Sequence, residues 1–236
     1  MTTQLTRELY ARVDATRARM RAAGDNGQVT LLAAVKYATA EQIDALIDYG
    51  VCDVGENRVQ QLLEHYEAMR NRDRARIHFI GSLQTNKVKY IADKVCMIHS
   101  LDSYRLAQEI EKQCAKLGKT MDVLVEINSG REQNKGGLMP EEAADFCLSL
   151  RDFPHLCLRG FMTMAPKCEK NEEYRKFFSE TYQNALDIWQ KKLDNIGGTF
   201  VMSMGMSDSY EAAIMEGATL VRVGGALFRN ECVSNP

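Results

Sequence analysis

Residues 31–37 read Leu31-Leu32-Ala33-Ala34-Val35-Lys36-Tyr37, an apolar run with a lysine near its C-terminal end. Continuous apolar runs of this length are typical of parallel strands that are buried on both faces. Two interpretations of Lys36 are open. In the first, the strand stops at Val35 and the amine reaches solvent along its four-carbon stem. In the second, the amine lies in a partly desolvated pocket, where burial favours the neutral form, a nucleophile that can form a Schiff base with an aldehyde.

Short apolar runs of the same kind continue along the chain and alternate with amphipathic stretches typical of helices. The further apolar runs cover 51–54, 77–80, 95–99, 121–127, 156–161, 199–203 and 219–223. The amphipathic stretches cover 3–23, 40–49, 57–70, 84–93, 103–117, 140–150, 171–193 and 208–216. This order predicts an α/β fold, a (β/α)8 TIM barrel whose extra N-terminal helix takes the eighth outer position. A doubly wound open sheet has the same local pattern and is the alternative.

Composition limits the domain organisation and the class of partner. The chain of 236 residues has no Pro-rich or Ser-rich linker, so we expect a single domain over 1–236. Its 32 acidic and 30 basic residues are interspersed, which argues against a nucleic-acid partner. The polar N-terminus lacks a signal core, and no run approaches the roughly 18 apolar residues of a membrane span. We therefore expect a cytoplasmic protein with no membrane partner.

The cysteines and histidines do not form a pattern that indicates a disulfide framework or a metal site. The seven cysteines are an odd number without a Cys-x-x-Cys pair, and Cys96 and Cys157 lie in apolar runs. We interpret them as small core residues in a reducing compartment. The four histidines lack ligand spacing, so no metal is expected.

Two late loops indicate a site for an anion. The seventh predicted strand leads into Met204-Gly205-Met206-Ser207-Asp208 and the eighth into Arg222-Val223-Gly224-Gly225-Ala226. Small residues before a helix leave backbone N–H groups free to converge on an anion, and barrels commonly hold a phosphate in these loops. Ser203 and Ser207 are the hydroxyl candidates. Two ordinary tight turns are the alternative interpretation.

Arg222 interrupts the last predicted strand much as Lys36 interrupts the first. A guanidinium cannot lose its charge, so an arginine in a buried strand needs an acceptor or an exposed barrel mouth. The first and last strands of a closed barrel are neighbours, and Lys36 and Arg222 would then face one pocket. A lysine, a phosphate cradle and an arginine able to donate to a ring nitrogen are the three parts of a pyridoxal 5'-phosphate (PLP) site.

Eight sequence motifs in order support this interpretation. They are Ala34-Val35-Lys36 and the segments 55–58, 78–87, 99–102, 126–137, 159–162, 203–207 and 221–224. With these motifs the chain resembles the PLP homeostasis protein family, also described as YggS-like or proline-synthase co-transcribed proteins. The single-domain barrel of that family is similar to the N-terminal domain of alanine racemase.

The resemblance implies a role for each matching residue. Lys36 would carry the internal aldimine, and Arg222 would contact the pyridine nitrogen. Ser207 with the backbone of Gly224 and Gly225 would hold the phosphate. The ring pocket would be lined by Asn57, Ser203 and Met204.

Two positions depart from the family pattern. Gly225 replaces the usual Thr or Ser, so only backbone donors remain there, and Arg229-Asn230 stands where a glycine commonly follows the phenylalanine.

The resemblance and the residue types favour a carrier over an enzyme. An arginine at the pyridine nitrogen disfavours protonation of that nitrogen and makes the ring a poorer electron sink. A racemase also needs a second acid or base, and no tyrosine or histidine stands out in the sequence for this role, although Tyr37 and His78 stay open as alternatives. We expect a non-catalytic or weakly catalytic protein, involved in PLP homeostasis, that holds, buffers or delivers PLP. Apo PLP-dependent enzymes would be its partners and the chain a monomer. The alternatives are a PLP-dependent amino-acid racemase or lyase, and a barrel that binds another phosphate ester with Lys36 as a simple charge.

Overall fold

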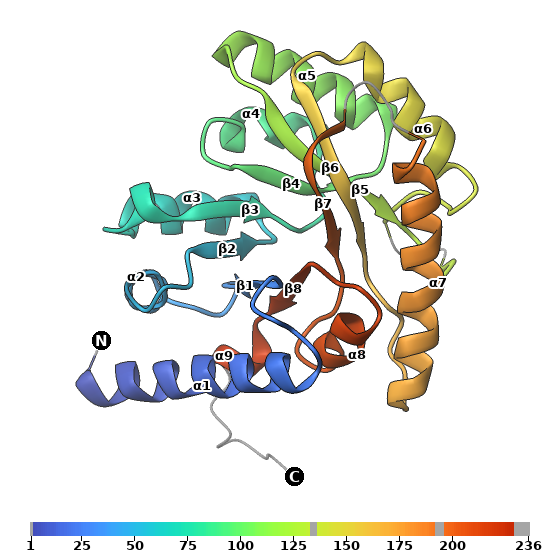
Figure 1. Ribbon diagram of the computed structural model, residues 1–236. Helices are drawn as coiled ribbons and strands as arrows, with labels where there is room; N and C mark the ends of the chain where they lie inside the picture. The colour runs from blue at the N-terminus through green and yellow to red at the C-terminus, as the bar shows by residue number, and fades with distance from the viewer. Residues whose placement is uncertain (1, 133–135, 192–195, 229–236) are drawn as a thin grey trace.

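Eight parallel strands close into one barrel in the order of the sequence (Figure 1). The computed structural model describes residues 2–132, 136–191 and 196–228. The strands are β1 (Thr30–Ala34), β2 (Asp53–Glu56), β3 (Arg76–Phe79), β4 (Met97–Leu101), β5 (Met121–Ile127), β6 (Leu156–Thr163), β7 (Ile196–Ser203) and β8 (Leu220–Val223). Because β1 pairs with β8 from Thr30↔Leu220 to Ala33↔Val223, the TIM barrel is confirmed and the open sheet is excluded.

Helices surround the barrel as the alternating pattern predicts (Figure 1). They are α1 (Thr3–Ala22), α2 (Ala40–Asp48), α3 (Val59–Ala68), α4 (Val88–Ile91), α5 (Tyr104–Leu117), α6 (Ala143–Ser149), α7 (Asn171–Trp189), α8 (Tyr210–Met215) and α9 (Gly225–Phe228), with 3-10 turns η1 (Arg72–Arg74), η2 (Thr85–Lys87) and η3 (Leu150–Asp152). The N-terminal helix α1 packs against α2, α8 and α9. It therefore fills the outer position between the last and first units of the barrel, as predicted.

Several element ends differ from the sequence-based boundaries. Strand β1 stops at Ala34, so that Lys36 and Tyr37 lie in a turn rather than in the strand. Helix α3 begins at Val59 because Arg58, its N-cap, is still extended. Helix α6 begins at Ala143, three residues after the start of the stretch predicted over 140–150. Hydrophobic periodicity locates an element well and its ends poorly.

Burial follows the hydrophobic pattern with one exception among the cysteines. The main core cluster joins strand residues to the inner faces of the helices, for example Leu9 and Val13 of α1. Cys114 and Cys147 are buried, whereas Cys157 is half-buried and Cys96 is exposed. The expectation that Cys96 lies in the core is wrong, because this residue is exposed in the connection just before β4 begins. Cys232 lies outside the described residues.

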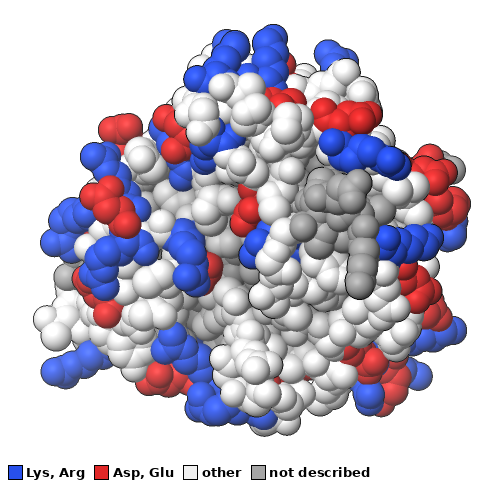
Figure 2. Space-filling model, turned by 45° about the horizontal axis from the view of Figure 1, so that its top comes forward, with Lys and Arg blue, Asp and Glu red and all other residues white. Residues whose placement is uncertain are grey.

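Two features of the structure concern the expected lack of nucleic-acid and membrane partners, namely the distribution of surface charge and the character of the helices. On the face shown in Figure 2, basic and acidic side chains are interspersed over the described residues. None of the described helices combines the length and apolar character that crossing a membrane requires.

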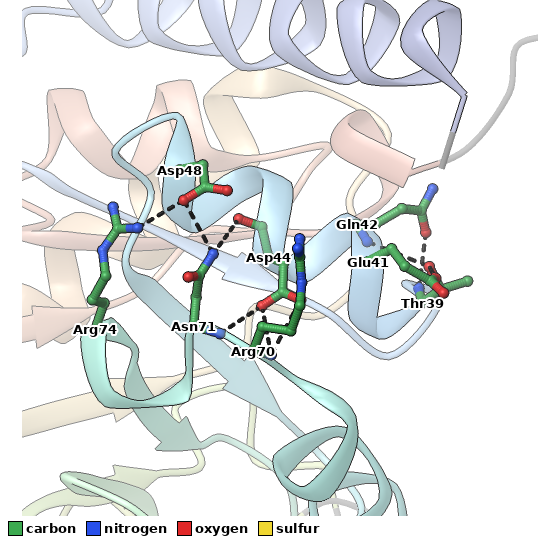
Figure 3. A network of polar contacts seen from close by, with 8 residues as sticks. All are labelled: Thr39, Glu41, Gln42, Asp44, Asp48, Arg70, Asn71 and Arg74. Carbon is green, nitrogen blue, oxygen red and sulfur yellow. Dashed lines mark hydrogen bonds and ion pairs between the residues drawn. The ribbon is translucent and has the colours of Figure 1, made fainter.

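A polar network on the outside of the barrel fastens α2 at both ends (Figure 3). At its start, Thr39 and Gln42 form a capping box, with Gln42 N donating to Thr39 Oγ1 at 3.3 Å and Thr39 N to Gln42 Oε1 at 2.9 Å. Farther along, the buried carboxylate of Asp44 accepts from the backbone N–H of Arg70 at 3.1 Å and of Asn71 at 2.9 Å. This network therefore holds the chain between α3 and β3 against α2.

Candidate functional site

The junction of β1 and β8 brings the predicted lysine turn to the predicted phosphate loop. A Cβ atom on Gly224 would lie 2.7 Å from the carbonyl oxygen of Ala34, so only glycine allows this approach. Lys36 follows two residues after Ala34 and is exposed in its turn. Its Nζ lies 4.7 Å from the centroid of the Tyr37 ring, and its carbonyl accepts from Gln61 Nε2 at 2.8 Å. This conformation corresponds to the first interpretation of Lys36, in which the strand ends before the lysine and the amine reaches solvent.

Ser207 connects the two loops that were expected to bind an anion. Its Oγ accepts from Gly224 N at 3.3 Å and from Ala226 N at 3.2 Å, at the start of α9. Ser207 precedes the stretch 208–216 that was predicted to be helical, but it does not cap α8. Ser209 is the N-cap of α8, and its Oγ accepts from Met206 N at 3.1 Å. The backbone therefore leaves Ser207 facing the β8–α9 turn, and the two loops form one cluster of donors.

Arg222 is buried inside the barrel and held by acceptors from two other strands. Its Nη1 donates to the carbonyl oxygen of Ser203 at 2.9 Å and to Ser203 Oγ at 2.8 Å. Its Nη2 donates to the carbonyl oxygen of Thr163 at 3.0 Å. Of the five N–H donors of a guanidinium, two then carry no hydrogen bond to a described residue. The structure thus supplies the acceptors that the sequence required for this arginine.

A chain of polar side chains continues from Ser203 through the barrel interior. His99 Nδ1 lies 3.1 Å from Ser203 Oγ, and His99 Nε2 lies 2.9 Å from His78 Nδ1. His78 Nε2 lies 3.1 Å from Asp53 Oδ1. Because β4 and β7 are not neighbours in the barrel, the contact between His99 and Ser203 crosses its interior. The chain runs from Asp53, the first residue of β2, to Ser203, the last residue of β7.

The charges along this chain depend on burial and on the partner of each group. Burial opposes the charge of His78, but hydrogen bonds with Asp53 and Cys96 outweigh it and raise the pKa of His78 to about 9. Burial, together with the charges of His78 and Arg222, places the pKa of His99 well below its ordinary value. Burial opposes the charge of Asp53 as well, and its hydrogen bonds with His78 and Arg76 nevertheless hold its pKa down at about 2. The arrangement is therefore a carboxylate, a charged imidazole and a neutral imidazole in sequence.

Glu126 is a second buried acid near the arginine. Burial and the nearby Asp102 raise the pKa of Glu126 to about 7, while the charge of Arg222 acts in the opposite direction. A Cβ atom on Gly136 would lie 3.6 Å from Asp102 Oδ2 and 3.7 Å from Glu126 Oε2, so both carboxylates face the same glycine. Burial in turn lowers the pKa of Arg222 to about 10, and the Glu126 carboxylate partly offsets this. A carboxyl group that titrates near neutral pH stands beside the buried guanidinium.

The remaining predicted residues are not all in one cavity. Ser203 and Met204 are fully buried. Asn57 is half-buried and lines a cavity of about 480 Å³ between α3 and α4, together with Arg58, Lys87 and Tyr90. Its Oδ1 atom is buried without a hydrogen-bond partner among the described residues. The segments 55–58 and 78–87 nevertheless touch, because a Cβ atom on Gly81 would lie 2.2 Å from the carbonyl oxygen of Asn57.

Gly225 is the first residue of α9, so the position without a hydroxyl lies at a helix start. His78 is buried against Asp53 and Tyr37 is 59% exposed, so these two candidate bases lie in different environments. Lys135 and Arg229-Asn230 lie outside the described residues.

The sequence singles out Arg222 but does not predict the chain of polar side chains that continues from Ser203 through the barrel interior. Asp53, His78, His99 and Ser203 are each a polar residue within an otherwise apolar run, which is the same signal that singled out the arginine. Glu126 carries this signal too. What the sequence does not contain is the barrel register that places these residues in contact.

Comparison with known proteins agrees with the fold. The model of the family "Alanine racemase, N-terminal domain" matches residues 10–231. The pyridoxal phosphate homeostasis protein of Aquifex aeolicus is 42% identical over 198 residues, which are 84% of this chain and 85% of that protein. A crystal structure of an unknown protein from Bifidobacterium adolescentis has a TM-score of 0.89 at 31% identity and covers 97% of each chain.

A second solved structure contains the cofactor that the sequence indicates. It is PipY of Synechococcus elongatus with PLP bound, which has a TM-score of 0.83 at 26% identity and covers 94% of this chain and all of PipY. The match by the family model and the match to the Aquifex protein each span most of the chain. The chain therefore belongs to the alanine racemase N-terminal domain family and, within it, to the pyridoxal phosphate homeostasis proteins.

Proposed function

We propose that this chain binds PLP at the end of the barrel where β1, β7 and β8 finish, and that it holds, buffers or delivers the cofactor. The observation that supports this most is the contact of Gly224 with Ala34, which joins the Lys36 turn to the Ser207 loop cluster above the buried Arg222. An amine, a cluster of N–H donors and a guanidinium match the aldehyde, the phosphate and the pyridine nitrogen of PLP.

Each group of residues would hold a different part of the cofactor. The Lys36 amine would form a covalent C=N bond with the aldehyde carbon, with loss of water. Ser207, Gly224 and Gly225 would bind the phosphate through one hydroxyl and backbone donors. Arg222 would donate to the ring nitrogen with the N–H groups that Ser203 and Thr163 do not use. The walls of the ring pocket are proposed to include Asn57, Ser203 and Met204.

The residues around the ring favour storage over strong catalysis. Bound PLP supplies an aldehyde for amines and a ring that can withdraw electrons. Strong electron withdrawal by the ring requires a protonated pyridine nitrogen, which a neighbouring carboxylate stabilises. Arg222 would place a positive charge at this position instead, and so it disfavours protonation of the ring nitrogen. We further propose that apo PLP-dependent enzymes receive the cofactor, that the protein acts in the cytoplasm and that it is a monomer. Sedimentation tests the last point.

The decisive test is whether PLP is fixed on Lys36. We expect the purified protein with PLP to show a visible absorption band that disappears on borohydride reduction, with the pyridoxyl group mapping to the peptide that contains Lys36. Lys36→Ala should abolish the band, and Lys89→Ala, a lysine on α4, should leave it unchanged. A protein that stays colourless with added PLP would refute the proposal.

A second assay separates carrier from enzyme. We expect loaded protein to restore activity to an apo PLP-dependent enzyme without racemising or cleaving amino acids itself. Amino-acid turnover that Lys36→Ala abolishes would instead favour the racemase or lyase alternative.

A further inference from the structure

The polar chain inside the barrel can carry its hydrogens in two arrangements that differ by one proton. The carboxylate of Asp53 can only accept, so Nε2 of His78, 3.1 Å away, carries a proton in both. The free choice is at Nδ1 of His78, which faces Nε2 of His99 at 2.9 Å. One of these two nitrogens must donate and the other accept, because two bare nitrogens or two N–H groups cannot bond.

In the first arrangement His78 is doubly protonated. Its Nε2–H still donates to Asp53, and the donors on the other side of the ring point away from Asp53. His78 Nδ1 then donates to His99 Nε2, and the neutral His99 ring carries its proton on Nδ1. That proton is donated to Ser203 Oγ at 3.1 Å. Since Arg222 Nη1 also donates to this oxygen, Ser203 Oγ accepts two hydrogen bonds. The hydroxyl hydrogen of Ser203 then points away from both His99 and Arg222.

In the second arrangement His78 has lost its Nδ1 proton and the donors point the other way. His99 then carries its proton on Nε2 and donates it to His78. The bare Nδ1 of His99 accepts from the hydroxyl of Ser203, which accepts only from Arg222. The loss of one proton from His78 therefore changes the Ser203 hydroxyl from an acceptor to a donor toward His99.

We propose that His99 is a positioning residue for the cofactor site, which transmits the protonation state of His78 to the Ser203 hydroxyl and so to the donors of Arg222. The inference rests on the proposed PLP site, because Arg222 is the residue that would touch the ring. When two donors share Ser203 Oγ, each bond to it weakens, and the Arg222 guanidinium is held less firmly than when Arg222 donates to it alone.

The surroundings of the chain support this coupling. On one side, His78 faces three groups, which are Asp53, Arg76 and Cys96. On its other side lies His99, which in turn faces Arg222. Glu126 and Asp102 lie beyond Arg222. Asp53 and Arg76 also line a cleft of about 340 Å³ at the N-terminal face of the barrel. The Asp53 end of the chain therefore borders solvent, at the end of the barrel opposite the proposed cofactor site. The raised pKa of His78 and the lowered pKa of His99 favour the first arrangement at neutral pH.

The direction of the hydrogen bonds can be measured without PLP. In ¹⁵N-labelled protein we expect the ring nitrogens of His99 to show the proton on Nδ1 at pH 7 and on Nε2 once His78 has lost its proton. Signals are assigned with His78→Gln and His99→Gln, and His65 and His155 serve as internal controls. A His99 tautomer that does not change while His78 titrates would overturn the proposal.

The effect on the site is measured in the PLP-loaded protein. We expect the pH profile of its visible band to contain a transition that moves at least one pH unit lower in Asp53→Asn, because the variant lacks the anion that favours protonated His78. The matched control is Asp44→Asn, at another buried carboxylate, which lies outside the barrel and should leave the profile in place. Coincident profiles for wild type and Asp53→Asn would refute the proposal.

The two experiments separate the failure of this inference from the failure of the proposed function. If wild-type protein forms no visible band with PLP, the cofactor proposal fails, and the link to the site fails with it. If the band forms but either the tautomer or the Asp53→Asn profile fails to change as expected, PLP binding stands and the role of His99 is refuted.

Discussion

Two buried carboxylates, Asp44 and Asp53, anchor two polar networks that differ in the kind of partner they have. Asp44 lies outside the barrel, and its oxygens accept from the backbone N–H groups of Arg70 and Asn71 (Figure 3). Asp53 lies at the N-terminal end of β2, and the chain that starts there continues through two imidazoles and a hydroxyl. Backbone donors cannot change their role, whereas imidazoles and hydroxyls can.

This difference separates a structural network from a candidate functional one better than burial does. Asp44 and Arg222 are 2% and 4% exposed, so burial does not distinguish the two networks. The Asp44 network has one hydrogen-bond arrangement and ties α2 to the chain before β3. The chain from Asp53 to Arg222 has two arrangements and ends at the proposed cofactor site. Substitutions in each network should therefore affect different measurements.

The largest effect is expected for Asp44→Ala. The backbone N–H groups of Arg70 and Asn71 would lose their acceptor, and each unsatisfied buried group costs about 1–3 kcal/mol, so the free energy of unfolding should fall by about 4 kcal/mol. Urea unfolding measures it. Asp44→Asn keeps one acceptor oxygen and should lose about half as much. A loss below about 1 kcal/mol for Asp44→Ala would mean that water replaces the carboxylate and that the network contributes little.

Glu126→Gln should change stability in the opposite direction at alkaline pH. The pKa of Glu126 is raised from 4.5 to about 7, mainly by burial and by Asp102. Between these values the folded chain holds a proton that the unfolded chain has lost, so stability falls as pH rises through this window, by roughly 3 kcal/mol in total. The variant should lack this fall and be more stable than wild type at pH 8. The free energies of unfolding of wild type and Glu126→Gln are measured at pH 5 and at pH 8. A difference between the two proteins that is the same at both pH values would contradict the buried position of Glu126.

The sequence predicts the barrel better than the interior of the barrel. Each strand is an apolar run, so eight runs in alternation with helical periodicity identify the fold without tertiary information. Arg222 stands out because a guanidinium in an apolar strand needs an acceptor. The loops at Ser207 and Gly224 stand out because small residues there leave backbone donors free.

What the sequence does not predict depends on register and on side-chain direction. Leu32↔Arg222 and Gly55↔His78 are neighbours only because β1 pairs with β8 and β2 with β3 at those positions. The contact of His99 with Ser203 joins residues 104 positions apart on strands that are not neighbours. The end of β1 at Ala34 is likewise invisible, since Val35 continues the apolar run but lies outside the strand.

Ser207→Ala should weaken the proposed phosphate site with a smaller effect than the buried carboxylates have on stability. Removing one hydroxyl that bonds Gly224 N and Ala226 N costs about 1 kcal/mol, and an equal loss in binding would raise the dissociation constant of PLP about five-fold. Ser209→Ala is the matched control, because that hydroxyl accepts from Met206 N at the start of α8. Equal PLP affinity in the two variants, measured by absorbance titration, would remove Ser207 from the proposed site.

The smallest effect is expected at the rim of the Asp44 network. Arg74 Nη1 lies 2.7 Å from Asp48 Oδ1, but the two side chains are 56% and 48% exposed. Water and salt screen such a pair, so Arg74→Ala should change the free energy of unfolding by only about 0.5 kcal/mol. The difference should shrink further in 1 M NaCl, where the Debye length is about 3 Å. A loss comparable with that of Asp44→Ala would mean that the rim and the buried centre act as one unit. A small, salt-sensitive loss would instead place the strength of this network in the backbone donors that Asp44 accepts.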